Sequence, residues 1–187
     1  MKIPYIHGFN SSSKSNTKNR LEEALEIDVI PLEWECNNSY NNNLKSLYNQ
    51  IKKINSDFLI IGSSTGSFYA DHLTNFDYIR GLVLFNPVIN PKKQLSNFLG
   101  KNKNFSTGEE YLFTPEILNS YDNIDINYET INRVIFIGKN DNILDNKETK
   151  KFYKNRAYIK WVDEGHIIEN FEPYKNDILE MFNLIGG

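Results

Sequence analysis

The sequence predicts an α/β fold, in which a mostly parallel sheet of about six strands carries helices on both faces. The main observation is that two kinds of apolar pattern alternate along the chain. Short, nearly continuous apolar segments, typical of strands buried on both faces, lie at Ile3–Ile6, Ile27–Leu32, Phe58–Ile61, Leu82–Phe85, Val134–Ile137 and Ala157–Val162. Between them, apolar residues recur every three or four positions, as on one face of a helix. This alternation favours right-handed crossovers, and we expect the strand order 2-1-3-4-5-6.

Length and charge narrow the classes of protein that fit. The 187 residues suit one domain with a full core, so we expect a single domain over residues 1–187. The net charge of −3 predicts no general attraction to nucleic acid or to an anionic membrane. No segment approaches the roughly 20 apolar residues that spanning a bilayer requires, so membrane insertion is not expected.

Two features predict a cytoplasmic location. The opening segment, MKIPYIHGF, is too short and too interrupted for a secretory signal and fits a first strand. Cys36 is the only cysteine, so no internal disulfide can form, which is typical of proteins from reducing compartments.

One long segment, at about residues 88–130, departs from the alternation. It contains no convincing strand, although Gln94–Leu99 and Pro115–Tyr121 each fit a short helix. The segment is far longer than a simple crossover needs. We interpret it as a cap or lid over a functional site; a packed segment without contact to substrate is the alternative.

The segment Gly62-Ser63-Ser64-Thr65-Gly66 carries the clearest chemical signal. It follows an apolar strand and precedes a predicted helix from Ser67 to about Leu73. A nucleophilic serine on such a sharp turn needs small residues two positions before and two after it, because the chain passes close to itself. Gly62 and Gly66 meet this demand and make Ser64 the candidate nucleophile. A turn of small residues that only lets the helix pack on the strand is the alternative.

A serine nucleophile needs a base, and the chain has three histidines. His166 follows the last predicted strand, at the carboxyl edge of the sheet where Ser64 also lies. His72 falls within the helix after Ser64, so we interpret it as a surface or packing residue. His166 is therefore the candidate base.

The third member of such a site is a carboxylate between the serine and the histidine in chain order. Asp141 lies three residues after Gly138, where a buried strand ends at the correct edge of the sheet. It would orient the imidazole and stabilise the imidazolium. Asp145 is the alternative, although it fits equally the cap of a helix that begins near Lys147.

The loop after the first strand, from His7 to Ser12, is placed to supply an oxyanion donor. We expect the backbone N–H of Phe9 and that of Thr65 to bind the developing oxyanion, with Gly8 allowing close approach. His7 would then be structural and fix the loop.

Taken together, these motifs resemble the YqiA/YcfP family of small bacterial esterases within the α/β-hydrolase superfamily. The matching segments run in order along nearly the whole chain: Tyr5–Ser12, Ile61–Ser64 with Gly66, Tyr69-Ala70, Phe85–Pro87, Thr107–Tyr111, Asp141 with Leu144-Asp145, Gly165-His166 and Phe171-Glu172. The resemblance implies a minimal α/β-hydrolase fold. It also implies hydrolysis of a small carboxylic ester or thioester through an acyl-enzyme by Ser64, Asp141 and His166, without a metal or another cofactor.

The chain departs from the family pattern at two places. Thr65-Gly66-Ser67 stands where the family usually has Leu-Gly-Gly, and Glu164 precedes Gly165-His166 where Gly-Asp-His is common. These changes bear on substrate choice more than on catalysis. Aromatic residues of the long segment are expected to form a small core of their own rather than an acyl pocket: Phe98, Phe105, Tyr111, Phe113 and Tyr121.

Two other functions stay open. A catalytically silent hydrolase-like domain that binds a small molecule or a protein is the first, although such domains usually lose a catalytic residue. The second is a nucleotide hydrolase, because residues 8–15 come within one residue of a phosphate-binding loop. Ser13 stands where that loop needs glycine, and no acidic residue follows the strands at Ile61 and Phe85 to hold magnesium.

Overall fold

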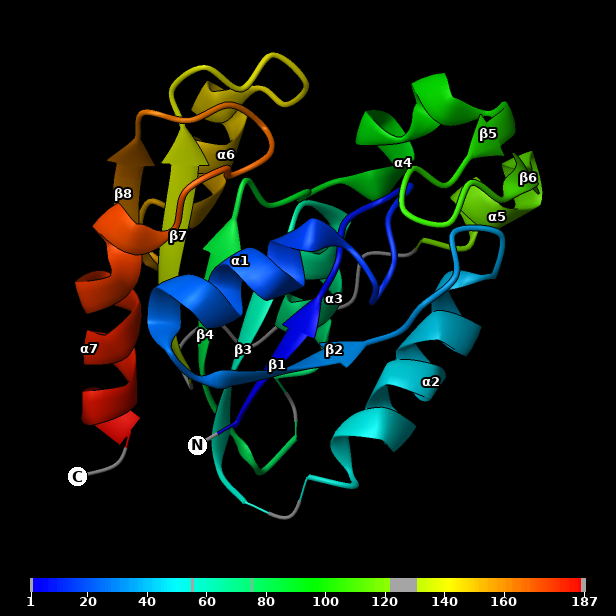
Figure 1. Ribbon diagram of the computed structural model, residues 1–187. Coiled ribbons are helices and arrows are strands. Elements are labelled where there is room, and N and C mark those ends of the chain that lie inside the picture. Colours follow the sequence, from blue (N-terminus) through cyan, green and yellow to red (C-terminus); the bar gives the residue numbers. More distant parts are fainter. Residues whose placement is uncertain (1, 55, 75, 122–130, 186–187) are drawn as a thin grey trace.

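The computed structural model describes residues 2–54, 56–74, 76–121 and 131–185 and contains a six-stranded parallel sheet (Figure 1). The strand order is β2-β1-β3-β4-β7-β8, and every neighbouring pair is parallel. The strands are β1 (Lys2–Ile6), β2 (Asp28–Leu32), β3 (Phe58–Ser63), β4 (Ile79–Phe85), β7 (Asn132–Gly138) and β8 (Tyr158–Val162). All six predicted strands and their predicted order are confirmed.

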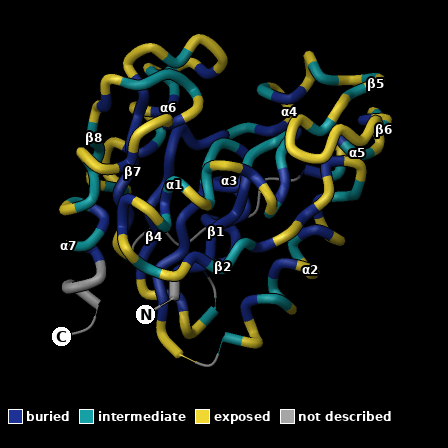
Figure 2. The backbone as a smooth tube through the Cα atoms, in the orientation of Figure 1, coloured by how far each residue is buried: buried dark blue, intermediate teal, exposed yellow. Residues whose placement is uncertain are grey.

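Helices cover both faces of this sheet. One face carries α1 (Asn16–Leu25) and α7 (Lys175–Ile185), and the other carries α2 (Tyr40–Ile51), α3 (Thr65–His72) and α6 (Asn146–Tyr153). Because successive strand residues point to opposite faces, Ile61 packs in the core beneath α1 and α7, whereas Ile60 packs in the core beneath α2 and α3. Figure 2 shows the buried residues concentrated along the sheet. Within the part of the chain that the structure describes, none of the helices has the length and apolar character needed to cross a membrane.

The long segment after β4 has more regular structure than the sequence predicts. It holds α4 (Pro91–Gln94), a 3-10 turn (Ser96–Phe98), β5 (Gly100–Lys103), β6 (Glu110–Phe113) and α5 (Pro115–Asn119). The expectation of no strand here is wrong, because β5 and β6 form an antiparallel hairpin. The strand β5 reads Gly-Lys-Asn-Lys, so it lacks the apolar residues by which a strand is recognised in a sequence. Residues 122–130 of the segment lie outside the described residues.

The hairpin is tied to the loop between β1 and α1. The backbone N–H of Phe105 donates to the Asn10 carbonyl at 2.8 Å, and the Asn104 side-chain amide donates to the Ser11 carbonyl at 2.8 Å. The Tyr111 hydroxyl also donates to the Asn10 side chain. These bonds hold the segment beyond the carboxyl ends of the strands (Figure 1).

Candidate active site

Ser64 occupies a strained turn between β3 and α3. Its φ of 53° and ψ of −121° lie in a region that L-residues rarely adopt. Both flanking glycines are sterically required: a Cβ atom at Gly62 would lie 2.7 Å from the Ser67 Cα, and one at Gly66 would overlap the Ile6 carbonyl oxygen. The turn therefore presents the Ser64 side chain at the carboxyl edge of the sheet.

Three of the predicted site residues are brought together in a hydrogen-bonded series. His166 Nε2 lies 3.0 Å from Ser64 Oγ, and His166 Nδ1 lies 2.8 Å from Asp141 Oδ2. The other carboxylate oxygen of Asp141 accepts the backbone N–H groups of Ile143 at 2.8 Å and Leu144 at 3.1 Å. Burial opposes the ionised form of Asp141, but His166 and these two amides outweigh it, so the pKa of the carboxyl lies below its ordinary value. The group is held as a carboxylate.

Asp145, the other candidate acid, lies at the start of α6. Its side chain caps α6 and accepts the N–H groups of Lys147 at 2.9 Å and Glu148 at 3.3 Å. Of the two candidate acids, it is Asp141 that the structure brings to His166.

The two expected oxyanion donors lie beside Ser64. Thr65 is the first residue of α3, so its N–H has no acceptor within the helix. Gly8 is close to Ser64, since a Cβ atom at Gly8 would lie 3.2 Å from the Ser64 Cβ. The next amide, that of Phe9, has no hydrogen-bond acceptor among the described residues. Both N–H groups are thus open for a ligand.

The Phe9 ring is held by aromatic residues of the long segment. Its centroid lies 5.2 Å from that of Phe98 and 5.0 Å from that of Phe113. The aromatic side chains of the segment therefore lie in two environments. Phe113 is fully buried, whereas Phe98 and Phe105 border the cleft at Ser64.

His7 and His72 lie apart from this series. His7 is fully buried, stacks on Trp34 with 5.3 Å between ring centroids, and has Nδ1 2.9 Å from the Gly8 carbonyl oxygen. His7 Nε2 lies 3.3 Å from a Glu33 carboxylate oxygen without the alignment of a hydrogen bond. His72 is buried against Phe68, with 4.0 Å between the ring centroids.

Asn86 is a site residue whose role the sequence motifs do not reveal. It follows β4, has φ 42° and is 2% exposed. Its side-chain amide donates to the carbonyls of Gly165 and His166, each at 2.9 Å, and its side-chain oxygen accepts the Gly138 N–H at 2.7 Å. The single side chain thus joins the loop of His166 to the end of β7, from which the loop of Asp141 starts. The sequence signals for it are its position between a strand and Pro87 and the match of Phe85–Pro87 to the family, and neither indicates which groups it binds.

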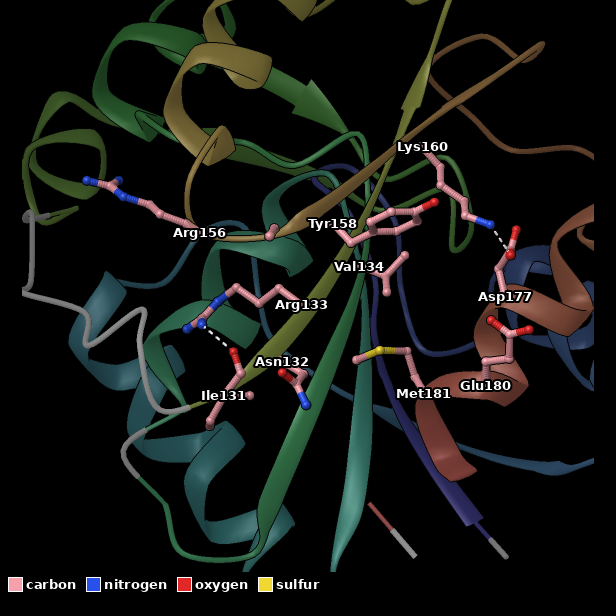
Figure 3. A pocket seen from close by; sticks show the side chains of 11 residues that line it. Ile131, Asn132, Arg133, Val134, Arg156, Tyr158, Lys160, Asp177, Glu180 and Met181 are labelled. Carbon is pink, nitrogen blue, oxygen red and sulfur yellow. Dashed lines mark hydrogen bonds and ion pairs between the residues drawn. The ribbon is translucent and has the colours of Figure 1, made fainter. Parts of the chain in front are cut away.

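Ser64 and His166 open into a cleft of about 640 Å³. Part of the cleft lining is apolar and includes Val88, Leu95 and Phe98 from the long segment. Another part comes from the loop before α1 and from the start of that helix. A second cavity of about 520 Å³ lies at the other end of the sheet, where β7 and β8 begin (Figure 3). It holds the Lys160–Asp177 ion pair and none of the predicted site residues.

Among the described ranges, His, Cys, Asp and Glu side chains form no cluster of three or more that could hold a metal ion.

The fold is that of the α/β-hydrolases. Solved structures with the same fold include Est1E from Butyrivibrio proteoclasticus, with a TM-score of 0.73, 16% identity, and coverage of 97% of this chain and 88% of that one. An α/β superfamily hydrolase from Oenococcus oeni PSU-1 has a TM-score of 0.70 and 18% identity over 99% of this chain and 91% of its own. A monoacylglycerol lipase from Paleococcus ferrophilus has a TM-score of 0.69 and 13% identity, with coverage of 96% and 92%.

The family to which the chain belongs is shown by a match over nearly its whole sequence. Residues 2–183 match the family described as uncharacterised protein family UPF0227, the YqiA/YcfP family, and the chain belongs to it.

Proposed function

We propose that the protein is a serine hydrolase that cleaves a small carboxylic ester or thioester through an acyl-enzyme. The observation that carries the proposal is the unbroken series from Ser64 Oγ through His166 to the Asp141 carboxylate, with separations of 3.0 Å and 2.8 Å. A base within hydrogen-bonding reach of a serine, itself oriented by a third group, is what activates such a nucleophile.

In the proposed reaction, Ser64 Oγ bonds to the carbonyl carbon while its proton passes to His166 Nε2. The carbonyl electron pair moves to oxygen, where the N–H groups of Phe9 and Thr65 stabilise the charge. The electron pair then returns, the bond to the alcohol or thiol breaks, and the leaving group takes the proton from His166. Water attacks the acyl-enzyme in the same way, with its proton going to His166 and then to Ser64 Oγ as the acid leaves.

Asp141 has two tasks in this reaction. Its carboxylate accepts the Nδ1–H of His166, which leaves Nε2 free to receive the serine proton. Its negative charge stabilises the imidazolium that forms. The low pKa of Asp141 supports both tasks, because the group stays ionised throughout the neutral range.

The surroundings support further parts of the proposal. We propose that the segment at residues 88–130 acts as a cap, since Gln94, Leu95 and Phe98 border the cleft. We also propose that the enzyme works in the cytoplasm, because Cys36 is a free, buried thiol. The phosphate-loop alternative is disfavoured, because the Ser13 N–H in that loop already donates to Glu33 at 3.1 Å.

Labelling with a fluorophosphonate probe tests the proposal. The wild-type protein should be labelled, and labelling should disappear in Ser64→Ala and in His166→Ala. Ser63→Ala is the matched control, because Ser63 is the neighbouring serine and has no base beside it. A folded wild-type protein that is not labelled, or a Ser64→Ala variant that still is, would contradict the proposal and favour a silent binding domain.

A further inference from the structure

The cleft at Ser64 has a second side that the reaction described above does not use. It is formed by the loop before α1 and by the first turns of that helix: Lys14, Ser15, Asn16, Thr17 and Arg20. Building on the proposed function, we propose that this side binds an anionic group, a carboxylate or a phosphate, carried by the ester or thioester substrate. We call these five residues the α1 subsite.

The helix itself favours an anion at this place. α1 has ten residues, and the first N–H groups of an α-helix have no acceptor within the helix. The N-cap residue Ser15 does not accept any of them with its side chain, and the first turn contains no acidic residue. The partial positive charge at the helix start is therefore not compensated by the usual side chains.

Ser15 gives an independent indication of a ligand. The residue is 8% exposed, it lines the cleft, and its Oγ makes no hydrogen bond of ordinary geometry to any of the described residues. A buried hydroxyl without a partner is unfavourable unless a ligand or a water satisfies it. The Tyr5 phenol also lines the cleft. Burial raises its pKa to about 12, despite the nearby hydroxyls of Thr17 and Ser15, so it stays a neutral donor.

The charged side chains around the α1 subsite are Lys14, Arg20 and Glu169, and the imidazole of His166 lies toward Ser64. Lys14 is exposed and has no ion-pair partner among the described residues. Arg20 pairs with Glu169 at 2.6 Å, and the two side chains are 34% and 62% exposed. Such an exposed pair is weak, so an anion can share or replace Glu169 as the partner of Arg20. The cationic side chains of Lys14 and Arg20 thus lie near a single carboxylate, the exposed Glu169.

The position of the α1 subsite selects a class of substrate. Because it shares one cleft with Ser64, an anion bound there belongs to the same molecule as the ester bond at Ser64. The apolar part of the cleft lining, with Val88, Leu95 and Phe98, suits a hydrocarbon group. The substrate class is therefore an ester or thioester that carries both an apolar part and an anionic group.

Matched substrates test this inference. For charge on the acyl part, 4-nitrophenyl hemiglutarate is compared with neutral 4-nitrophenyl hexanoate. For charge on the leaving group, butyryl thioesters of 4-mercaptobutyrate and of 3-mercaptopropyl phosphate are compared with that of 1-pentanethiol. In at least one set, kcat/KM of the wild type should be about tenfold or more higher for an anionic member than for the neutral one. The anionic member that is preferred then shows whether the bound group is a carboxylate or a phosphate.

The Lys14→Gln, Arg20→Gln double variant should lose that preference. Lys18→Gln is the matched control: it removes one positive charge from α1, and Lys18 pairs with Glu22 outside the cleft. Equal kcat/KM for charged and neutral members in the wild type, or a preference that survives in the double variant, would overturn the inference.

A binding measurement separates this inference from the proposed function. Titration calorimetry with glutarate and with inorganic phosphate on Ser64→Ala requires no catalysis. Binding of either ion that is weakened about tenfold by the double substitution, and unchanged by Lys18→Gln, would support the α1 subsite even if no ester were cleaved. Absence of binding together with turnover of the neutral esters alone would overturn the α1 subsite and leave the hydrolase proposal intact.

Discussion

Replacement of Asn86 by alanine tests whether one buried amide holds the two loops of the site in place. The substitution removes three hydrogen bonds, to Gly138 N–H and to the carbonyls of Gly165 and His166. Each such bond contributes about 1 kcal/mol, and more when a buried partner is left unpaired. A positive φ adds about 1 kcal/mol of strain for alanine. We therefore expect the free energy of unfolding to fall by about 3–4 kcal/mol.

Three further variants separate these contributions. Asn86→Gly should regain about 1 kcal/mol relative to alanine, because glycine adopts a positive φ without strain. Asn86→Asp keeps the acceptor for Gly138 but turns a carboxylate toward two carbonyls, so it should lower kcat for ester hydrolysis with little change in KM. Asn146→Ala is the matched control: its amide donates one bond, to the Gly138 carbonyl at 2.7 Å, so its loss should be about 1 kcal/mol.

Urea unfolding followed by circular dichroism gives the free energies, and kcat and KM for 4-nitrophenyl butyrate give the positioning effect. An Asn86→Ala protein within about 0.5 kcal/mol of wild type would refute the reasoning. So would an Asn86→Asp protein with an unchanged kcat.

Three other predictions concern the acid, a buried histidine and the cysteine. Asp141→Asn should lower kcat by on the order of 10³- to 10⁴-fold, whereas Asp145→Asn should leave kcat near wild type; a larger loss of kcat in the second variant would reverse the assignment. Burial lowers the pKa of His72, so the unfolded state binds more protons below about pH 6.5 and stability should fall as pH falls from there. His72→Gln should reduce that fall, measured as urea midpoints at pH 7.5 and 5.5, and an equal fall in both proteins would count against it. Burial raises the pKa of Cys36 to about 11, so the folded protein at pH 8 should react with a disulfide reagent on the order of 100-fold more slowly than the unfolded one. Equal rates would contradict this.

Much of the fold could be predicted because the parallel strands are buried on both faces. Segments such as Phe58–Ile61 then read as continuous apolar runs, and their alternation with helical spacing indicates the α/β class. The hairpin of β5 and β6 could not be predicted in this way. Its strands are short and largely exposed, Phe113 is their one buried residue, and hydrogen bonds to the loop at Asn10 add to the contact that Phe113 makes.

Parts of the candidate site depend on geometry that a sequence does not contain. The spacing that indicates a serine nucleophile can be read from five consecutive residues, although only part of its steric cause is local. A Cβ atom at Gly62 would meet the nearby Ser67, whereas one at Gly66 would overlap the Ile6 carbonyl oxygen of β1. The choice between Asp141 and Asp145 is not local, since either residue could cap a helix or face an imidazole. Asn86 joins segments about 50 and 80 residues away, so its three bonds become visible only once the sheet is assembled.

The bonds between the hairpin and residues 10 and 11 have a consequence for how a substrate enters. A hairpin that swung outward would pull the Asn10 and Ser11 carbonyls with it, and the adjacent Phe9 amide would leave its place beside Ser64. The segment therefore cannot open widely while the oxyanion site stays formed. We expect substrates to enter along the side of α1 while the hairpin stays in place, so the segment would act as a fixed wall of the enzyme during turnover.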